Sequence, residues 1–255
     1  FFSTLDFGSD KFNRTDNYFM HYLKITFKVL LITAITFSAA VPLYSQNAQE
    51  MSDEAFDNLL ESFVIPAIDY TETEGTPYFN PSFQPGSITF SSGSTRDDVS
   101  FKYNTYEDRL EISFQNRLFA IPVDQIDHFH IKMNGENYRF EKGFDSRGLD
   151  QDEFVLILSE GPAKGLLKFE TSFQQAMASY GTATQQDEYI QDKTLYVHRE
   201  GNTERVRRLR ARNILRELDS HHNELENYIS RNDLNLENTD HLMDLFRYYN
   251  SLINS

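Results

Sequence analysis

Apolar and polar residues alternate through the middle of the chain. From Ser87 onward the period is two, as at Ile88 and Phe90, and similar runs recur between turn-forming residues as far as Thr171. Such alternation indicates strands with one buried side and one solvent-facing side. It predicts a mainly antiparallel β-meander over residues 87–171, and a curved open sheet and a closed barrel are both compatible with the pattern.

One hairpin in this region has a well-defined register. Asn134-Gly135 stands between two alternating runs and is a strong signal for a two-residue turn. This turn places Phe129 opposite Phe140 on the buried side of the sheet. On the other side it places His128 opposite Glu141.

The preceding hairpin has a longer predicted connection. Apolar residues alternate on both sides of residues 115–118, which we take as the link. This spacing predicts Phe114 opposite Phe119. It also predicts Ile112 opposite Ile121, with both on the buried face.

The pattern changes towards the end of the β region. Residues 154–158 form a continuous apolar run, which is typical of a strand buried on both faces. Residues 172–193 are rich in Gln, Thr, Ala and Asp, and we predict a polar loop or linker there. Residues 194–198 predict one last strand.

Helical spacing appears on either side of the β region. Residues 52–63 predict a short helix, because Ser52 is a suitable N-cap and the apolar residues fall three and four apart. After Asn202 three amphipathic stripes follow, the last of them capped by Asn238. The sequence therefore predicts an α+β protein with a short N-terminal helix and a C-terminal unit of about three helices.

The stretch 20–45 has the layout of a secretory signal peptide. Two lysines precede an apolar run, and small and polar residues follow it up to Ser45. The run is shorter than the roughly 20 residues of a spanning helix, so we expect cleavage and a mature chain without a transmembrane span. An uncleaved N-terminal anchor is the alternative.

The predicted layout is an upstream extension at 1–19, the signal peptide at 20–45, a helix with a turn-rich lead-in at 46–86, the β domain at 87–171, the polar loop at 172–193, and a final strand with helices at 194–255.

Composition narrows the class of partner. The chain has 39 acidic and 24 basic residues and a formal charge of −15 at pH 7. This charge disfavours nucleic acid, whose phosphates require a basic surface. The chain contains no cysteine, which excludes disulfides, thiol catalysis and an acylated cysteine anchor. No catalytic or nucleotide-binding motif rises above background, so the sequence predicts no cofactor.

Two histidines and a carboxylate form a candidate metal site. His128 and His130 lie on one face of a predicted strand, and Glu141 is predicted opposite His128. Two imidazoles and a carboxylate suit a transition metal such as zinc. The competing interpretation is an exposed polar face with ordinary cross-strand pairs.

Acidic and basic clusters give two further candidates. Residues 97–98, 107–108 and 150–153 hold carboxylates that suit calcium, although none has the spacing of a calcium-binding loop. A run of arginines forms the concentrated basic patch, which suits anionic lipid head groups or an acidic partner surface. A solvated helix face, or pairing with the acidic β region, is the alternative for this patch. The arginines are Arg205, Arg207, Arg208, Arg210, Arg212 and Arg216.

Three segments carry a family resemblance. They are Gly75-Thr-Pro-Tyr-Phe-Asn80, Tyr103-Asn-Thr-Tyr-Glu-Asp-Arg-Leu-Glu111 and Tyr248-Tyr-Asn-Ser-Leu252. Together they resemble a widespread group of exported bacterial proteins that share a signal peptide, a β-rich middle, a variable loop and a helical C-terminal tail. The resemblance implies the domain layout and an exported location. The group has no assigned activity, so the resemblance implies no catalytic residue.

These observations lead to an expectation about function. We expect an exported envelope protein, periplasmic or extracellular, that acts by binding another envelope protein or an anionic lipid. One alternative is a small-molecule or lipid carrier, if the sheet closes into a barrel with an apolar interior. The other is a hydrolase, if the acidic loop residues converge in one cleft.

Overall fold

The computed structural model describes residues 49–65, 73–176 and 186–254. The predicted upstream extension and signal peptide lie outside these residues, as do residues 177–185 of the predicted polar loop. Among the described residues, no helix combines the length and the apolar character needed to cross a membrane.

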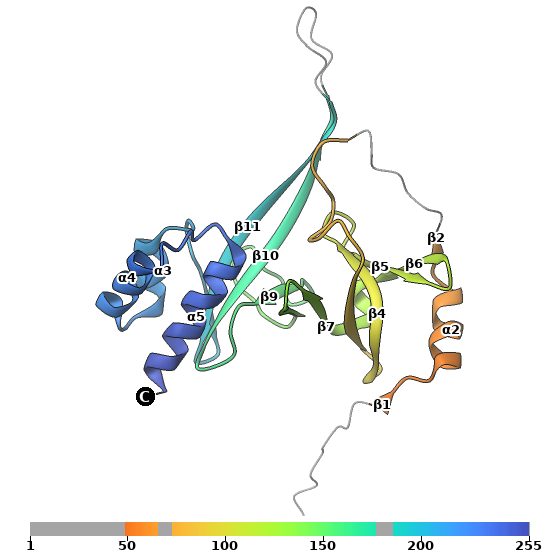
Figure 1. Cartoon of the computed structure of the whole chain (residues 1–255), viewed down its shortest axis with the longest axis horizontal. Helices are drawn as coiled ribbons and strands as arrows, with labels where there is room; N and C mark the ends of the chain where they lie inside the picture. Colours follow the sequence, from red (N-terminus) through yellow and green to blue (C-terminus); the bar gives the residue numbers. More distant parts are fainter. Residues whose placement is uncertain (1–48, 66–72, 177–185, 255) are drawn as a thin grey trace, which may run out of the picture. The chain divides into compact units, whose positions relative to one another are not determined.

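Twelve described strands form one sheet (Figure 1). The pairing order runs β12-β11-β10-β9-β8-β7-β3-β4-β5-β6-β2, and β1 joins in parallel with β4. Because β12 and β2 end this order without pairing with each other, the sheet is open and does not close into a barrel. The strands are β1 (Gln49–Glu50), β2 (Val64–Ile65), β3 (Gln84–Phe90), β4 (Ser94–Asn104), β5 (Arg109–Phe114), β6 (Arg117–Pro122), β7 (Ile126–Met133), β8 (Glu136–Glu141), β9 (Val155–Ile157), β10 (Ala163–Gln174), β11 (Glu188–Arg199) and β12 (Asn202–Arg205).

The sheet is mainly antiparallel, as predicted, but it is not a single meander. β3 pairs with β4 on one side and with β7 on its other side, where Ile88 lies opposite Phe129. The chain therefore builds β4, β5 and β6 away from β3 and then returns to add β7. The sheet thus contains two meanders, β3 to β6 and β7 to β12, which are joined by the pairing of β3 with β7.

The β7–β8 hairpin has the predicted register. Phe129 pairs with Phe140 and His128 with Glu141 around the turn at Asn134-Gly135. Both turn residues have positive φ, 54° and 81°, as a two-residue hairpin turn requires.

The predicted register of the β5–β6 hairpin is wrong by two residues. Phe114 pairs with Arg117 and Ile112 with Phe119. The cause is a tight turn at Gln115-Asn116, where φ is 48° and 60°, in place of a longer link. A shift of two residues keeps each side chain on its face, so the predicted buried set is retained.

The predicted polar loop at 172–193 is shorter than expected. β10 continues to Gln174 and β11 begins at Glu188, and the two strands pair along their full length. The last strand expected at 194–198 is therefore part of a longer strand. Figure 1 shows this hairpin extending beyond the neighbouring β9. Its outer part has few apolar positions, so the sequence gives no clear strand pattern there.

The α-helices lie at both ends of the described chain, and a short 3-10 turn lies between β6 and β7. Ser52 caps the first helix by accepting the N–H of Ala55 at 3.2 Å, and Asn238 caps the last, both as predicted. The first C-terminal helix starts at Ala211, later than the pattern after Asn202 suggested, because the intervening residues begin with β12. The helices are α2 (Asp53–Glu61), the 3-10 turn η1 (Val123–Gln125), α3 (Ala211–Leu218), α4 (His222–Arg231) and α5 (Thr239–Ile253).

One main core joins the sheet to both sets of helices. It includes Phe56 of α2 and Phe246 of α5. Phe246 lies where a Cβ on Gly165 of β10 would be 2.8 Å from its ring, so the absence of a side chain there allows α5 to approach the sheet. A smaller core contains Val155 and Ile157, while Leu156 belongs to the main core. This alternation confirms the predicted two-sided burial of residues 154–158.

Candidate functional site

A buried carboxylate holds the segment 75–80 against the sheet. Glu111 of β5 is 4% exposed and accepts hydrogen bonds from the Tyr78 hydroxyl at 2.8 Å and the Asn104 amide at 3.1 Å. Arg109 donates to the same carboxylate at 2.9 Å. Burial alone would raise the pKa of Glu111, but the hydrogen bonds from these three residues lower it overall. Glu111 is therefore ionised at neutral pH and fixes the segment in place.

This segment places Phe79 among other aromatic rings. The Phe79 N–H donates to the Tyr103 carbonyl at 2.9 Å. Its ring packs edge-to-face against Tyr138, Phe140 and Phe169, with centroid distances of 5.7, 5.0 and 4.9 Å. The rings form an aromatic wall with a geometry that aromatic side chains favour.

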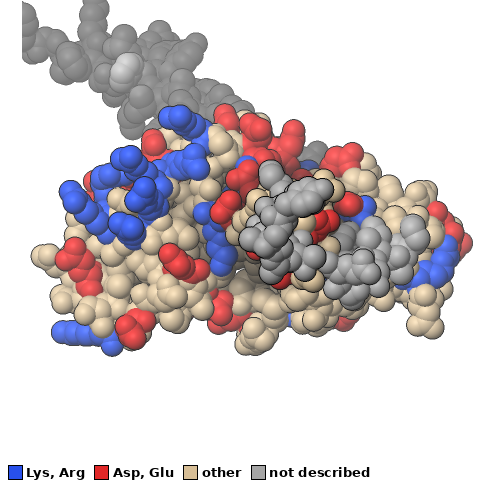
Figure 2. All heavy atoms as spheres, turned by 90° about the horizontal axis from the view of Figure 1, so that it is seen from above, with Lys and Arg blue, Asp and Glu red and all other residues tan. Residues whose placement is uncertain are grey.

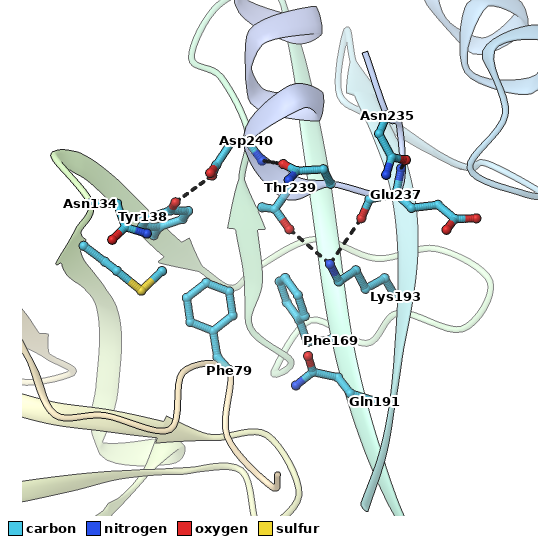
Figure 3. Close-up of a pocket in the computed structure, with 12 residues that line it drawn as sticks. Phe79, Asn134, Tyr138, Phe169, Gln191, Lys193, Asn235, Glu237, Thr239 and Asp240 are labelled. Atoms are coloured by element: carbon cyan, nitrogen blue, oxygen red, sulfur yellow. Dashed lines mark hydrogen bonds between the residues drawn. The ribbon is translucent and has the colours of Figure 1, made fainter. Parts of the chain in front are cut away.

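The aromatic wall borders a pocket of about 450 Å³, which we call the Lys193 pocket (Figure 3). Its volume lies within the roughly 300–1,000 Å³ of small-molecule sites. Figure 3 shows the Phe79 and Phe169 rings below the Lys193 amine, while Asp240 and Tyr138 lie above the rings and to the left of the amine. The lining residues are Phe79, Met133, Asn134, Tyr138, Phe169, Gln191, Lys193, Asn235, Glu237, Asn238, Thr239 and Asp240.

Lys193 reaches the pocket from β11. Its Nζ donates to the Glu237 carbonyl and to the Thr239 hydroxyl, both at 3.3 Å, and lies 5.6 Å from the centroid of the Phe169 ring. Burial lowers the pKa of Lys193, while the charges of Asp240 and Glu237 act in the opposite direction. The partly desolvated amine is a strong hydrogen-bond donor at the wall of the pocket.

Asp240 supplies an acceptor in the lining of the same pocket. It lies in the first turn of α5, where a negative charge is favoured, and its N–H donates to Asn238 Oδ1 at 2.8 Å. Asp240 Oδ1 accepts from the Tyr138 hydroxyl at 2.6 Å, and burial together with this bond raises the pKa of Tyr138. The phenol stays protonated and ties α5 to β8.

The predicted histidine site does not assemble. The His128 and His130 rings lie 5.7 Å apart, but Glu141 is ion-paired with Arg139 and, at 3.8 Å, with Lys164. Burial, followed by the charges of Arg139 and His128, lowers the pKa of His130 to about 4, so it is neutral at pH 7. Within the described ranges, no group of three or more His, Cys, Asp and Glu side chains could hold a metal ion. The geometry therefore gives the predicted metal site no support.

Two acidic residues from the predicted loop clusters do converge. Asp108, in the β4–β5 turn, and Glu153 line a hollow of about 220 Å³ together with Lys168. Lys168 pairs with Glu153 at 2.8 Å, and Asp108 accepts from the Tyr103 hydroxyl at 2.8 Å. Burial raises the pKa of Asp108; the Tyr103 hydrogen bond opposes this effect and the Glu153 charge adds to it. With Glu170, which pairs with Lys168 at 3.2 Å, three carboxyl groups thus line one hollow.

The predicted arginines gather around a hollow of their own. Arg207, Arg208, Arg210, Arg212 and Arg216 line about 470 Å³ of open space, whereas Arg205 is part of β12 and is not in the lining. Five of the six predicted arginines therefore line one hollow, and their role in binding stays a prediction.

The residues of the Lys193 pocket were not predicted from the sequence. Tyr138 and Asp240 lie 102 positions apart, so no spacing rule relates them. Two signals did point nearby. One was the cap at Asn238, and the other was the resemblance segment that contains Phe79.

Comparison with known proteins finds no matching family model, no matching curated protein and no matching solved structure.

Proposed function

We propose that this protein is an exported, non-enzymatic binding protein and that the Lys193 pocket holds its ligand. The observation that carries this proposal is the pocket itself, in which an aromatic wall faces a half-buried amine and a carboxylate. Pockets of this kind bind small molecules through apolar contact and a few convergent polar groups. The exported location rests on the predicted signal peptide at 20–45 and on the family resemblance.

The chemistry of the wall favours a hydroxylated ring compound, such as a monosaccharide or disaccharide. Hydroxyl groups both donate and accept hydrogen bonds, and they match the Lys193 donor and the Asp240 acceptor. The apolar face of such a ring packs on the Phe79 and Phe169 side of the pocket. Among the described lining residues there is no serine, cysteine or histidine, so a catalytic triad of the Ser-His or Cys-His type is not part of the pocket.

Asp240→Asn is expected to weaken ligand binding about tenfold. A hydrogen bond to a charged carboxylate contributes roughly 1.5 kcal/mol more to the binding free energy than one to a neutral amide. The amide oxygen can still accept the Tyr138 hydrogen bond, so the fold is retained. Native mass spectrometry of the protein purified from its own envelope would detect the bound adduct. Calorimetric titration with a panel of monosaccharides and disaccharides would measure affinity.

Asp244→Asn is the matched control. Asp244 lies one turn further along α5, pairs with Arg247 at 3.4 Å and is not in the pocket lining. Its substitution should leave affinity unchanged. A wild-type protein that carries no adduct and titrates with none of the sugars contradicts the proposal, as does equal loss in both variants.

A second candidate function is proton transfer at the hollow of Asp108 and Glu153. Burial raises the pKa of Asp108, as a general acid requires, and Asp108 shares the hollow with Glu153, which is ion-paired with Lys168. This arrangement meets the convergence condition of the hydrolase alternative. Retained hydrolysis of a glycoside or ester substrate after Asp108→Asn would exclude Asp108 as the acid.

Asp108→Asn is also expected to be neutral or stabilising at pH 7, unlike the average substitution, which costs about 1 kcal/mol. Burial in the folded state raises the pKa of Asp108, so folding favours the protonated form. The ionised form, present at neutral pH, destabilises the folded state relative to the unfolded state. Wild-type stability gains from this group as the pH falls through the folded pKa, and the variant lacks that gain. Urea unfolding of both proteins at pH 7 and pH 5 measures the difference, and a loss above about 1 kcal/mol at pH 7 contradicts the prediction.

A further inference from the structure

The arginine hollow is a concentration of positive charge on an acidic protein. It is lined by Arg207, Arg208, Arg210, Arg212, Asn213 and Arg216 and encloses about 470 Å³. Figure 2 shows Lys and Arg side chains gathered in one cluster on this face of the molecule. The chain as a whole carries a formal charge of −15, so the local charge of this cluster is opposite in sign to the net charge of the protein.

The cluster contains arginine alone. Residues 205–216 include six arginines and no lysine, although the chain contains both residue types. The guanidinium group presents a planar fork of donors that matches phosphate and carboxylate oxygens two at a time, which a lysine amine does not. Uniform use of arginine therefore favours an oxyanion ligand over general solubility.

The charge of the hollow is largely uncompensated within the described chain. Arg216 pairs with the adjacent Glu217, at 2.7 Å. For Arg207, Arg208, Arg210 and Arg212, the described residues provide no ion pair. Several like charges around one hollow concentrate the electrostatic potential and attract anions.

The backbone at the hollow adds to this potential. α3 begins here, with Arg210 in extended conformation at its N-cap and no side chain capping the first turn. The first-turn N–H groups and the positive end of the helix dipole therefore face the same region as the arginines. Asn213 Nδ2 donates to the Arg208 carbonyl at 3.3 Å, and the Arg210 N–H donates to it at 2.8 Å, so the loop is already shaped before a ligand binds.

We propose that the arginine hollow binds a ligand carrying two or more phosphate groups, from a soluble diphosphate or from a lipid head group. Its volume exceeds what one phosphate needs, and five guanidinium groups can contact several phosphate oxygens at once. The site is separate from the Lys193 pocket, and neither proposal depends on the other.

The test compares the hollow with an arginine elsewhere. Full-length protein, the double variant Arg208→Gln with Arg212→Gln, and the control Arg231→Gln are titrated with pyrophosphate by calorimetry. The same three proteins are co-sedimented with cardiolipin vesicles, whose head group carries two phosphates, and with phosphatidylcholine vesicles. Arg231 is exposed at the end of α4, outside the hollow. We expect the double variant to bind at least about tenfold more weakly and the control to match the wild type.

Each outcome bears on the proposal. Pyrophosphate binding that is lost in the double variant supports it with a soluble source. Binding to cardiolipin vesicles alone, lost in the same variant, supports it with a lipid source. No binding to either probe overturns it, as does equal weakening in Arg231→Gln. Binding of poly-glutamate without binding of pyrophosphate or vesicles also overturns it and indicates an acidic protein partner.

Discussion

Glu111→Gln is expected to reduce the free energy of unfolding by about 3 kcal/mol, the usual effect of removing one partner from a buried ion pair. Glu111 is 4% exposed and neutralises Arg109, at 2.9 Å, and Lys102, at 3.6 Å. Glutamine keeps the shape but leaves both cations with less compensation. Glutamine also places an NH₂ donor where the wild-type carboxylate has an acceptor oxygen, so one of the present donors loses its acceptor.

The pH dependence of this effect has a definite sign. The folded state lowers the pKa of Glu111 below 4.5, because the hydrogen bonds outweigh the opposing effect of burial. The stability that this group contributes is therefore present above the unfolded pKa and is lost as the pH falls through the folded pKa. The difference between wild type and variant should be large at pH 7 and should shrink below about pH 4.

Urea unfolding at several pH values measures this difference. Glu226→Gln is the control, because Glu226 is an exposed carboxylate on α4. The prediction fails if Glu111→Gln costs no more than the control, or if its cost is the same at pH 7 and pH 3.5.

Asn250→Ala is expected to cost about 3 kcal/mol for a different reason, since it leaves buried backbone groups without partners. Asn250 of α5 is 4% exposed, and its Oδ1 accepts the Ala163 N–H at 3.1 Å. Its Nδ2 donates to the carbonyl oxygens of Ala163, at 2.8 Å, and Glu160, at 3.2 Å. One side chain thus satisfies the turn that precedes β10.

The same contact explains a glycine in that turn. Gly161 has φ of +142°, and an added Cβ would lie 2.6 Å from Asn250 Cγ. A side chain at this position would displace the amide, so the turn and the helix depend on each other. We expect Gly161→Ala to produce a loss similar to that of Asn250→Ala.

Chemical denaturation measures the global loss, and hydrogen exchange at the Ala163 amide reports the local one. Asn223→Ala, at an exposed position on α4, is the matched control. Faster exchange at Ala163 with an unchanged control supports the assignment. Unchanged exchange together with a loss under about 1 kcal/mol contradicts it.

The parts of the fold that follow local rules could be predicted from the sequence. The Asn134-Gly135 turn set the β7–β8 register, and Asn238 marked the start of α5. The apolar run 154–158 indicated a strand buried on both faces. In each case the local structure is determined by a few residues that are neighbours in the sequence.

The errors arose where the local pattern was weak or ambiguous. Gln115-Asn116 forms a tight turn although neither residue is glycine, so a longer link was inferred. Residues 188–193 are strand because they pair with β10, and their polar composition gave no sign of it. The return of β7 to β3 is a choice between distant partners, which alternation alone does not specify.

The candidate site is harder to infer because it is built from distant segments. Phe79, Tyr138, Lys193 and Asp240 come from four separate parts of the chain. The three segments that carry the family resemblance have clear structural roles. Two of them meet at Glu111, and the third contains Asn250. The segments of the resemblance therefore contain residues that stabilise the fold, and they do not identify a ligand.

The position of β3 between β4 and β7 has a consequence for synthesis. β3 ends at Phe90 but its second partner ends at Met133, so about 40 further residues must be made before that pairing is complete. At about 5–20 residues per second this takes roughly 2–8 s. During that interval one edge of the central strand is an open template for pairing with other chains. The nascent protein thus passes through an aggregation-prone stage at the middle of its sheet, where the finished fold has no edge.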